Sequence, residues 1–347
     1  MHKKERTNPG NGKNMFLLLE ERLEQRDELC KVDKDFETYY LPIIYIIVFV
    51  TGFIGNGVAL WMFIFHMRPW SPITIYMFNL VLADLFYIFS LPILIFYYLK
   101  ASDWMFGEVL CKLLRFIFYV NLYSGILFLT CISVHRYTGV VHPMKSLGKL
   151  NKRLSTIVCV CVWIVVVAGI SPILYFSRTH LHTSGTSNST PQQDTNHTIC
   201  YDTTSQELLH TYFIYSMNTT FFGFCVPFAI ILVCNGFIVK ALIRNKMNSQ
   251  SRSRSVRLVI IVLLVFAISY LPFHVMKNLN LRSRLYYQGI DTCAWNKTVY
   301  AMYQVTRGLA SLNSSLDPIL YFLAGDNFRK RFPNATFRMT FRNETIV

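Results

Sequence analysis

Three basic residues lie inside long apolar stretches of the chain: Arg115, Lys277 and Arg307. A charged side chain in such a stretch costs several kcal/mol unless it faces a cavity or a partner. At 1.5 Å per residue of helix, they lie roughly 31, 30 and 24 Å from the ends of their stretches at Arg136, Arg257 and about Leu323 respectively. Three cations at similar depth predict a binding site for an anion.

An alternative explanation is that Arg115 and Lys277 extend to the membrane surface rather than into a site. It fits Arg307 less well. Gly308 and Ser311 follow Arg307 and are small enough to let a helix or a ligand approach closely. We therefore expect the Arg307 side chain to point into the protein.

Several polar rings could complete an anion site. His274 lies three residues before Lys277 and thus on the same helical face. Tyrosines also occur near the three cations and offer hydroxyl groups and rings: Tyr119, Tyr123, Tyr300 and Tyr303.

A second polar set lies near the middle of the apolar stretches and contains Asn56, Asp84, Asn121, Asn313, Ser314 and Asp317. Asp317 is about 15 Å further along its helix than Arg307. These groups predict either a hydrated pocket that holds a cation or a hydrogen-bond network that fixes helix packing. Residue types alone do not decide between the two.

The elements that position these residues are predicted to be membrane-spanning helices. Hydrophobic residues make up 53% of the 347 residues and charged residues only 15%, against about 25% charged in soluble proteins. Seven apolar stretches each reach the roughly 20 residues that cross a bilayer as helix: 40–65, 73–98, 110–135, 155–176, 212–239, 258–279 and 300–323. The predicted fold class is an all-α membrane protein, a bundle of seven transmembrane helices.

Basic residues predict the orientation of this bundle. The loops after the first, third and fifth stretches, together with the C-terminal tail, hold sixteen Lys and Arg residues and two acidic residues. The other three loops hold five basic and six acidic residues. Because Lys and Arg are retained on the cytoplasmic side, the N-terminus is expected outside. The net charge of +15 then indicates loops facing anionic lipid rather than a nucleic-acid partner.

The chain divides into an extracellular tail (1–39), the membrane domain (40–324) and a cytoplasmic end (325–347). Residues 327-NFRKRF-332 alternate aromatic and basic side chains, which predicts a short amphipathic eighth helix on the inner membrane surface. Three glycosylation sequons fall in predicted outer loops, at Asn188, Asn196 and Asn296.

Five cysteines lie within apolar stretches, and four lie at the predicted outer face: Cys30, Cys111, Cys200 and Cys293. An even number in an oxidising compartment predicts two disulfides, for which four cysteines allow three sets of pairings. The sequence shows no nucleophile elbow, phosphate-binding glycine loop or metal-spaced cluster. We therefore predict neither an enzyme nor a cofactor.

A motif in every predicted span resembles the rhodopsin-type (class A) G-protein-coupled receptors over about residues 30–332. The motifs are Gly55-Asn56, 80-LVLAD-84, His135-Arg136-Tyr137, Trp163, Pro227, Phe266 to Pro272, and 317-DPILY-321. Within that class the chain is similar to the metabotropic purinergic receptors for extracellular nucleotides, particularly to their ADP-responsive type. The stretches 113–148, 199–207, 271–282 and 303–331 carry this second resemblance.

The resemblance implies that the anion is a nucleotide whose phosphates are held by Arg115, Lys277 and Arg307. The other predicted ligand-binding residues are Tyr119, Tyr123, Asp202, His274, Asn280, Tyr300, Tyr303, Gln304 and Ser311. It also implies the disulfides Cys111–Cys200 and Cys30–Cys293, each of which joins segments expected at the outer rim. A sodium site is expected at Asp84, Asn121, Asn313 and Asp317.

The residues expected to take part in activation and G-protein coupling are His135, Arg136, Tyr137, Tyr270, Pro272, Asp317, Pro318 and Tyr321. Three of them depart from the class pattern, one of which is Asp317, at a position where most members have asparagine. His135 stands where many members have an acid that restrains the next arginine, and Tyr270 stands where many have tryptophan. Asn235 also replaces a customary tyrosine in the fifth span, a departure that bears on coupling efficiency rather than on ligand class.

The predicted function is therefore a plasma-membrane receptor for extracellular ADP or ATP that signals through a Gq-class heterotrimeric G protein, phospholipase C and calcium. The same cations would also suit a uracil nucleotide, a nucleotide sugar, a lysophospholipid or a carboxylate. An anion transporter is a more distant alternative, since the sequence shows no inverted repeats or broken helix pairs.

Overall fold

The computed structural model describes residues 35–100, 102–146, 151–183, 196–200, 203–244, 249–286 and 292–324. Its elements are α2 (Asp35–Phe65), α3 (Pro72–Leu99), α4 (Gly107–Val141), α5 (Pro143–Ser146), α6 (Lys152–Ile170), α7 (Ile173–Phe176), β1 (Thr179–Thr183), β2 (Asn196–Cys200), α8 (Leu209–Thr220), the π-helix η1 (Phe221–Cys225), α9 (Val226–Arg244), α10 (Ser249–Val265), the π-helix η2 (Phe266–Tyr270), α11 (Leu271–Tyr286) and α12 (Cys293–Ala324).

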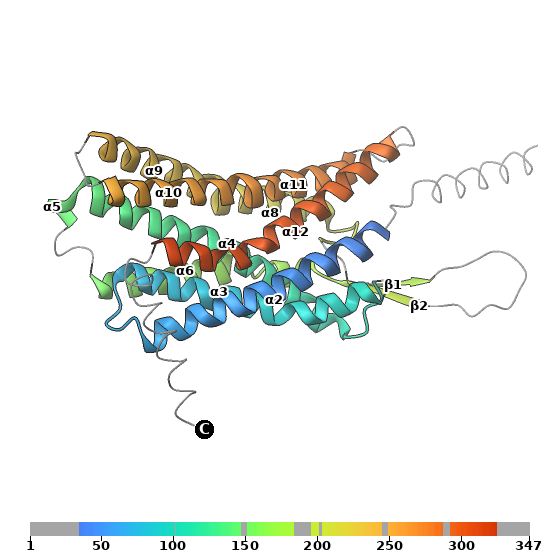
Figure 1. Cartoon of the computed structure of the whole chain (residues 1–347). Helices are drawn as coiled ribbons and strands as arrows, with labels where there is room; N and C mark the ends of the chain where they lie inside the picture. The colour runs from blue at the N-terminus through green and yellow to red at the C-terminus, as the bar shows by residue number, and fades with distance from the viewer. Residues whose placement is uncertain are drawn as a thin grey trace, which may run out of the picture.

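The long helices lie side by side as a bundle, with β1 and β2 projecting from one end (Figure 1). Among the described residues, six helical segments are long and apolar enough to cross a membrane: Phe36–Phe65, Pro72–Leu99, Gly107–Val141, Lys152–Phe176, Leu209–Arg244 and Val259–Tyr286. The 32-residue helix α12 packs against α2 and α11 as the seventh long segment. It carries Lys297, Arg307 and Asp317, which make it more polar than the other six segments. The predicted all-α bundle is confirmed.

Short polar side chains mark the residues at which α3 and α6 begin. The Ser71 side chain accepts a hydrogen bond from the Thr74 amide at 3.2 Å, and Pro72 occupies the first turn of α3. Asn151 caps α6 in the same way, through a 2.8 Å bond from the Leu154 amide. Both are N-caps, in which a short polar side chain satisfies an amide that the helix leaves unpaired.

Two prolines account for the π-helical turns in the fifth and sixth spans. Pro227 follows η1 by two residues, and Pro272 follows η2 by two residues. Proline lacks an N–H group and its ring clashes with the carbonyl four residues earlier, which here belongs to Gly223 or Ile268. The helix widens by one residue at each place, and this widening re-aims the side chains that follow.

At one end of the bundle, β1 and β2 form an antiparallel hairpin in which Thr179 pairs with Cys200 and Thr183 with Asn196. The loop before α4 anchors this hairpin. Asp103 accepts a hydrogen bond from the Thr198 amide at 3.1 Å, and the Trp104 amide donates to the Thr198 carbonyl at 2.7 Å. The hairpin is thus fixed above the helices that carry the predicted anion site.

The first helix begins at Asp35, ahead of the predicted domain boundary at residue 40, so the last residues of the predicted tail are helical. Hydrogen bonds from Tyr300 and Gln304 to Glu37 place these residues beside the first turns of α12, at the end of the bundle where β1 and β2 project (Figure 1). The predicted cytoplasmic end and eighth helix (325–347) lie outside the described residues.

Candidate ligand-binding site and activation residues

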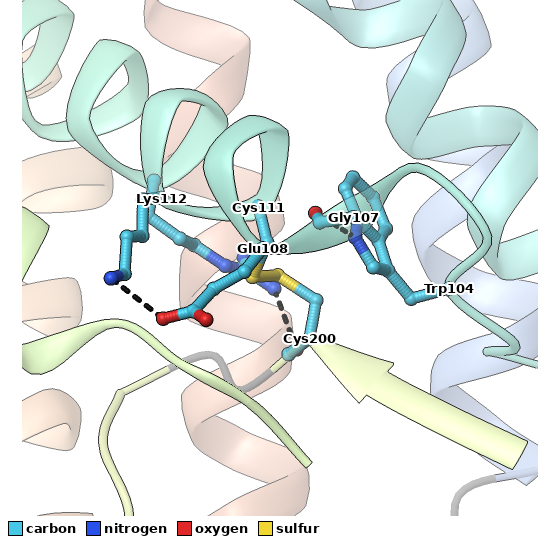
Figure 2. The surroundings of a disulfide bond; sticks show 7 residues. Trp104, Gly107, Glu108, Cys111, Lys112 and Cys200 are labelled. Carbon is cyan, nitrogen blue, oxygen red and sulfur yellow. Dashed lines mark hydrogen bonds and ion pairs between the residues drawn. A yellow bond between two sulfur atoms is a disulfide. The ribbon is translucent and has the colours of Figure 1, made fainter. Parts of the chain in front are cut away.

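The disulfide Cys111–Cys200 joins the first turns of α4 to the end of β2, with the two Cα atoms 5.8 Å apart. Figure 2 shows this bridge beside the 2.6 Å ion pair between Glu108 and Lys112. The predicted pairing is confirmed. Cys293, the first residue of α12, is also disulfide-bonded, and its predicted partner Cys30 lies outside the described residues. The five cysteines assigned to apolar stretches are free thiols.

Arg115 lies one turn below this disulfide and is buried, with 5% of its surface exposed. Its Nη2 atom donates to the Cys200 carbonyl at 3.4 Å. The guanidinium is therefore enclosed within the protein, beside the end of β2.

Arg307 is still more deeply buried, at 2% exposure, and points into the bundle as predicted. Its Nη2 atom donates to the Tyr98 hydroxyl of α3 at 2.6 Å. One turn along α12, the Ser311 hydroxyl donates to the Arg307 carbonyl at 3.0 Å and lies 2.7 Å from the Tyr87 hydroxyl.

Lys277 of α11 is 2% exposed. Its Nζ atom lies 5.3 Å from the centre of the Tyr119 ring and 5.9 Å from that of Phe273. Within the described part of the chain it forms no salt bridge. Cation–π contacts compensate only partly for the loss of hydration of a buried ammonium group, so an anionic ligand would stabilise this residue further.

His274 lies one turn from Lys277 and is 1% exposed. Its ring stacks on Phe224 at 4.6 Å and lies 5.6 Å from the Tyr123 ring. Its Nδ1 atom is 3.4 Å from the Thr220 hydroxyl, whereas the buried Nε2 atom has no hydrogen-bond partner among the described residues. Tyr119, in turn, lies 3.3 Å from the Tyr212 hydroxyl.

Glu37 is a buried acid at the outer end of α2 that the sequence reasoning left in the extracellular tail. It is 5% exposed, and its Oε2 atom accepts hydrogen bonds from the Tyr300 hydroxyl at 2.5 Å and from Gln304 Nε2 at 3.3 Å. Tyr98 was missed as well. Tyr97 and Tyr98 stand together at the end of an apolar stretch, where tyrosines are typical of a membrane interface, so no signal in the sequence pointed to the contact of Tyr98 with Arg307.

Three helices therefore carry the predicted ligand-binding residues. Arg115, Tyr119 and Tyr123 lie on α4; His274, Lys277 and Asn280 on α11; and Tyr300, Tyr303, Gln304, Arg307 and Ser311 on α12. All of them except the half-buried Tyr300 are buried. Ring contacts join the sets, since Phe273 lies 6.5 Å from Tyr119 and 6.1 Å from Tyr303. Asp202 lies outside the described residues.

The inner polar set forms a connected network between α2, α3, α4 and α12. Asn121 Nδ2 donates to Asp84 Oδ1 at 2.9 Å, and the Ser314 hydroxyl donates to Asn121 Oδ1 at 3.1 Å. Asn56 Nδ2 donates to the Ser314 carbonyl at 2.7 Å. These contacts provide the helix-locking network that was one of the two alternatives.

The same network also contains oxygen atoms of the kind that coordinate a small cation. Asp84 and Asp317 are both fully buried and face one another. Asn313 Nδ2 donates to Asp317 Oδ2 at 3.4 Å and to the Tyr270 hydroxyl. Asp317 Oδ1 and Asn313 Oδ1 are buried without a hydrogen-bond partner among the described residues. Two facing carboxylates cannot both be ionised at low cost without a shared cation or proton, so these oxygens fit a small cation.

At the inner end of α4, Arg136 is half-buried and forms no ion pair within the described residues. His135 lies 6.2 Å from the Tyr76 ring, and the Tyr137 hydroxyl lies 3.2 Å from His142 Nε2. The buried Asn235 of α9 has an amide nitrogen without a described partner.

The inner ends of α9 and α10 are held together by a small apolar cluster of Ile238, Leu242 and Val259. Tyr137 of α4 packs against this cluster. Among the described residues, no salt bridge joins these helix ends.

One cavity, of about 280 Å³, lies between α4, α6 and the α8–η1 segment. Its lining is mostly apolar and includes Tyr123, Val166, Tyr215 and Gly223. Tyr123 is a predicted ligand-binding residue, but none of the three predicted cations lines this cavity.

The comparisons with known proteins agree with this architecture. The family model described as 7 transmembrane receptor (rhodopsin family) matches residues 55–321. The chain therefore belongs to the rhodopsin family of seven-transmembrane receptors and is a multi-pass membrane protein. Membership of a receptor family excludes the transporter alternative and confirms that the chain is not an enzyme.

Within this family the chain is similar to the purinoceptors. It is 60% identical to the purinoceptor 1 of Gallus gallus over 320 residues, which are 92% of this chain and 85% of that protein. It is 58% identical to the Homo sapiens purinoceptor 1 over 317 residues, or 91% and 82% of the two chains. The identity to the Xenopus laevis purinoceptor 4 is 42% over 311 residues, 88% of this chain and 55% of that one.

Proposed function

We propose that this protein is a plasma-membrane receptor for extracellular adenine nucleotides, ADP or ATP. In this proposal Arg115, Lys277 and Arg307 bind the phosphates from three different helices, and the neighbouring tyrosines donate hydroxyl groups. The similarity to purinoceptors supports a purine ligand.

The observation that carries the proposal is the burial of Lys277 against two aromatic rings. A 2% exposed ammonium group that forms no salt bridge with a described residue is stabilised when a phosphate enters. Charge-assisted hydrogen bonds from arginine and lysine to phosphate are short and strong, and Arg115 and Arg307 add planar groups suited to phosphate oxygens.

In the signalling step, the nucleotide favours a state in which the inner ends of α9 and α10 separate near Arg136 and admit a G protein. A ligand shifts such an equilibrium only by its differential affinity for the two states. Ring contacts run from His274 to Phe224, from Phe224 to Phe266 and from Phe266 to Tyr270. Together with the hydrogen bond from Asn313 to Tyr270, they connect the proposed ligand site to the inner polar network. We propose the Gq class as partner, followed by phospholipase C and calcium release.

The proposed topology has an extracellular N-terminus and glycans on the outer loops. Asn188 lies outside the described residues, and Asn196 begins β2. Asn296 lies in the first turn of α12 and accepts a hydrogen bond from the Ser283 hydroxyl. A glycan at Asn296 would require this bond to open, so we expect Asn188 and Asn196 to be modified more completely.

We also propose that Asp84, Asn121, Asn313 and Asp317 bind sodium and that sodium opposes activation. Buried oxygens of Asp317 and Asn313 without described partners support a cation site. Asn121 would hold Asp84 in place, as its 2.9 Å bond indicates.

A calcium assay in cells expressing the receptor tests the ligand class. The panel is ADP, ATP, UTP, UDP-glucose and lysophosphatidic acid, with untransfected cells as the control. We expect ADP or ATP to act at the lowest concentration. A stronger response to UTP, UDP-glucose or lysophosphatidic acid would be consistent with the anion site but would contradict the proposal that the ligand is an adenine nucleotide.

A further inference from the structure

The outer half of the bundle contains a buried acid beside the buried cations. Three acidic side chains are buried in the described part of the chain, namely Glu37, Asp84 and Asp317. The two aspartates belong to the inner network, whereas Glu37 lies at the outer end of α2. Neither the proposed phosphate binding nor the proposed activation step uses this carboxylate.

Glu37 contacts the same face of α12 that carries Arg307. Residues Tyr300, Gln304, Arg307 and Ser311 are spaced by four, three and four positions, which places them on one face of the helix. The outer two donate hydrogen bonds to Glu37 Oε2, at 2.5 and 3.3 Å. The inner two contact α3, since Arg307 donates to Tyr98 and Ser311 lies beside Tyr87.

The adjacent turn of α2 fixes this arrangement. The Tyr40 hydroxyl, one turn from Glu37, donates to the Val305 carbonyl at 3.0 Å and approaches the bare Cα of Gly308. A methyl group at Gly308 would lie 2.7 Å from that hydroxyl. The first helix is thus in close contact with α12, and the Glu37 carboxylate is held against the two turns of α12 that precede Arg307.

We propose that Glu37 is a specificity-determining residue that limits the negative charge of the ligand. This inference rests on the proposed function. An anion bound at Arg307 that extends outward along α12 passes Gln304 and Tyr300 and approaches the Glu37 carboxylate. Like charges in a site of low dielectric constant repel strongly, so each additional phosphate is disfavoured. The preferred ligand class is therefore a nucleoside diphosphate rather than a triphosphate.

The test compares ADP with the hydrolysis-resistant β,γ-methylene analogue of ATP in competition binding on washed membranes. We expect Glu37→Gln to improve the affinity for the ATP analogue relative to ADP by about ten-fold, the effect of removing one charge about 10 Å away at an effective dielectric constant of about 20. The glutamine oxygen still accepts a hydrogen bond from Tyr300. Glu37→Asp keeps the charge and should keep the wild-type ratio.

Glu108→Gln is the matched control, because it removes a half-exposed outer carboxylate that is paired with Lys112 at 2.6 Å. Its affinity ratio should equal that of the wild type. The readout is a ratio of two affinities on the same membranes, so it does not depend on the amount of folded receptor.

Three results would overturn the inference. Unchanged affinities for both nucleotides in Glu37→Gln would leave Glu37 only a link between α2 and α12, as would the absence of both Glu37→Gln and Glu37→Asp from the membrane. Equal losses for both nucleotides would make it a positioning residue without charge selectivity. If the wild type binds neither nucleotide, the proposed function fails first; if it binds ADP and the ratio does not move, only the role of Glu37 fails.

Discussion

The hydroxyl oxygen of Tyr270 lies in the space that a side chain at Gly125 would need. A methyl group at Gly125 would be 2.8 Å from this oxygen and 3.6 Å from Asn313 Nδ2. The tyrosine of η2 and the glycine of α4 are thus complementary in shape. Since Tyr270 also hydrogen-bonds Asn313, this packing connects the sixth span to the proposed cation site.

We expect Gly125→Ala to destabilise the receptor by about 1–3 kcal/mol, the usual cost of adding a methyl group to a well-packed core. The thermal unfolding midpoint of the detergent-purified protein should fall. Adding Tyr270→Phe should recover most of the loss, because it removes the atom that the methyl group contacts. Gly139→Ala is the control, since nothing lies within 4 Å of a methyl group there. Independent, additive effects at positions 125 and 270 would contradict the proposed packing.

The sequence predicted the bundle and the burial of the cationic residues because both follow from the high cost of charge in an apolar medium. It placed Arg307 correctly inside the bundle on the evidence of its small neighbours. It did not predict Glu37 or Tyr98 as partners in the site. Such contacts depend on how α2 and α3 rotate and pack against α12, which hydropathy does not specify. Nor did it predict that Gly125 faces the Tyr270 hydroxyl.

Sodium should lower the affinity of the agonist ADP, because a bound cation stabilises the network of the resting state. Asp84→Asn should abolish this effect, since it removes one of the two facing carboxylates. The measurement is competition binding on membranes in sodium chloride, with N-methylglucamine chloride at equal ionic strength as the control. Indifference of the wild type to sodium would reduce the Asp84–Asp317 network to a structural role.

The two predicted disulfides should have different consequences. Cys111→Ser removes the bridge that holds β2 over Arg115, so we expect a large loss of receptor at the cell surface. Cys293→Ser should leave more receptor at the surface and mainly weaken the nucleotide response. Surface immunolabelling and calcium responses separate these effects, with Cys161→Ser, an exposed free thiol, as control. Peptide mapping of the unreduced protein tests the partner of Cys293; finding Cys30 joined to Cys111 or Cys200 would refute the predicted pairing.

The cationic residues themselves give the most direct test of nucleotide binding. A charge-assisted hydrogen bond contributes about 1.5–3 kcal/mol, and each 1.4 kcal/mol is about a factor of ten in affinity. Arg307→Ala and Lys277→Ala should therefore weaken ADP binding by about 10- to 150-fold while the protein still reaches the surface. Arg307→Lys should recover only part of the loss, because an ammonium group cannot form the planar bidentate contact with phosphate.

Tyr98→Phe separates a role in positioning Arg307 from phosphate binding by Arg307. It removes the 2.6 Å hydrogen bond to Arg307 but leaves the positive charge, so its effect on ADP affinity should be smaller than that of Arg307→Ala. Arg115→Ala should weaken ADP and also lower surface expression, because Arg115 donates to the Cys200 carbonyl under the hairpin. Radioligand binding and surface labelling on the same cells measure both quantities. If the alanine variants of Arg307 and Lys277 reach the surface and respond to ADP at wild-type concentrations, the phosphates are not bound by these residues, and the ligand must be sought among other anions.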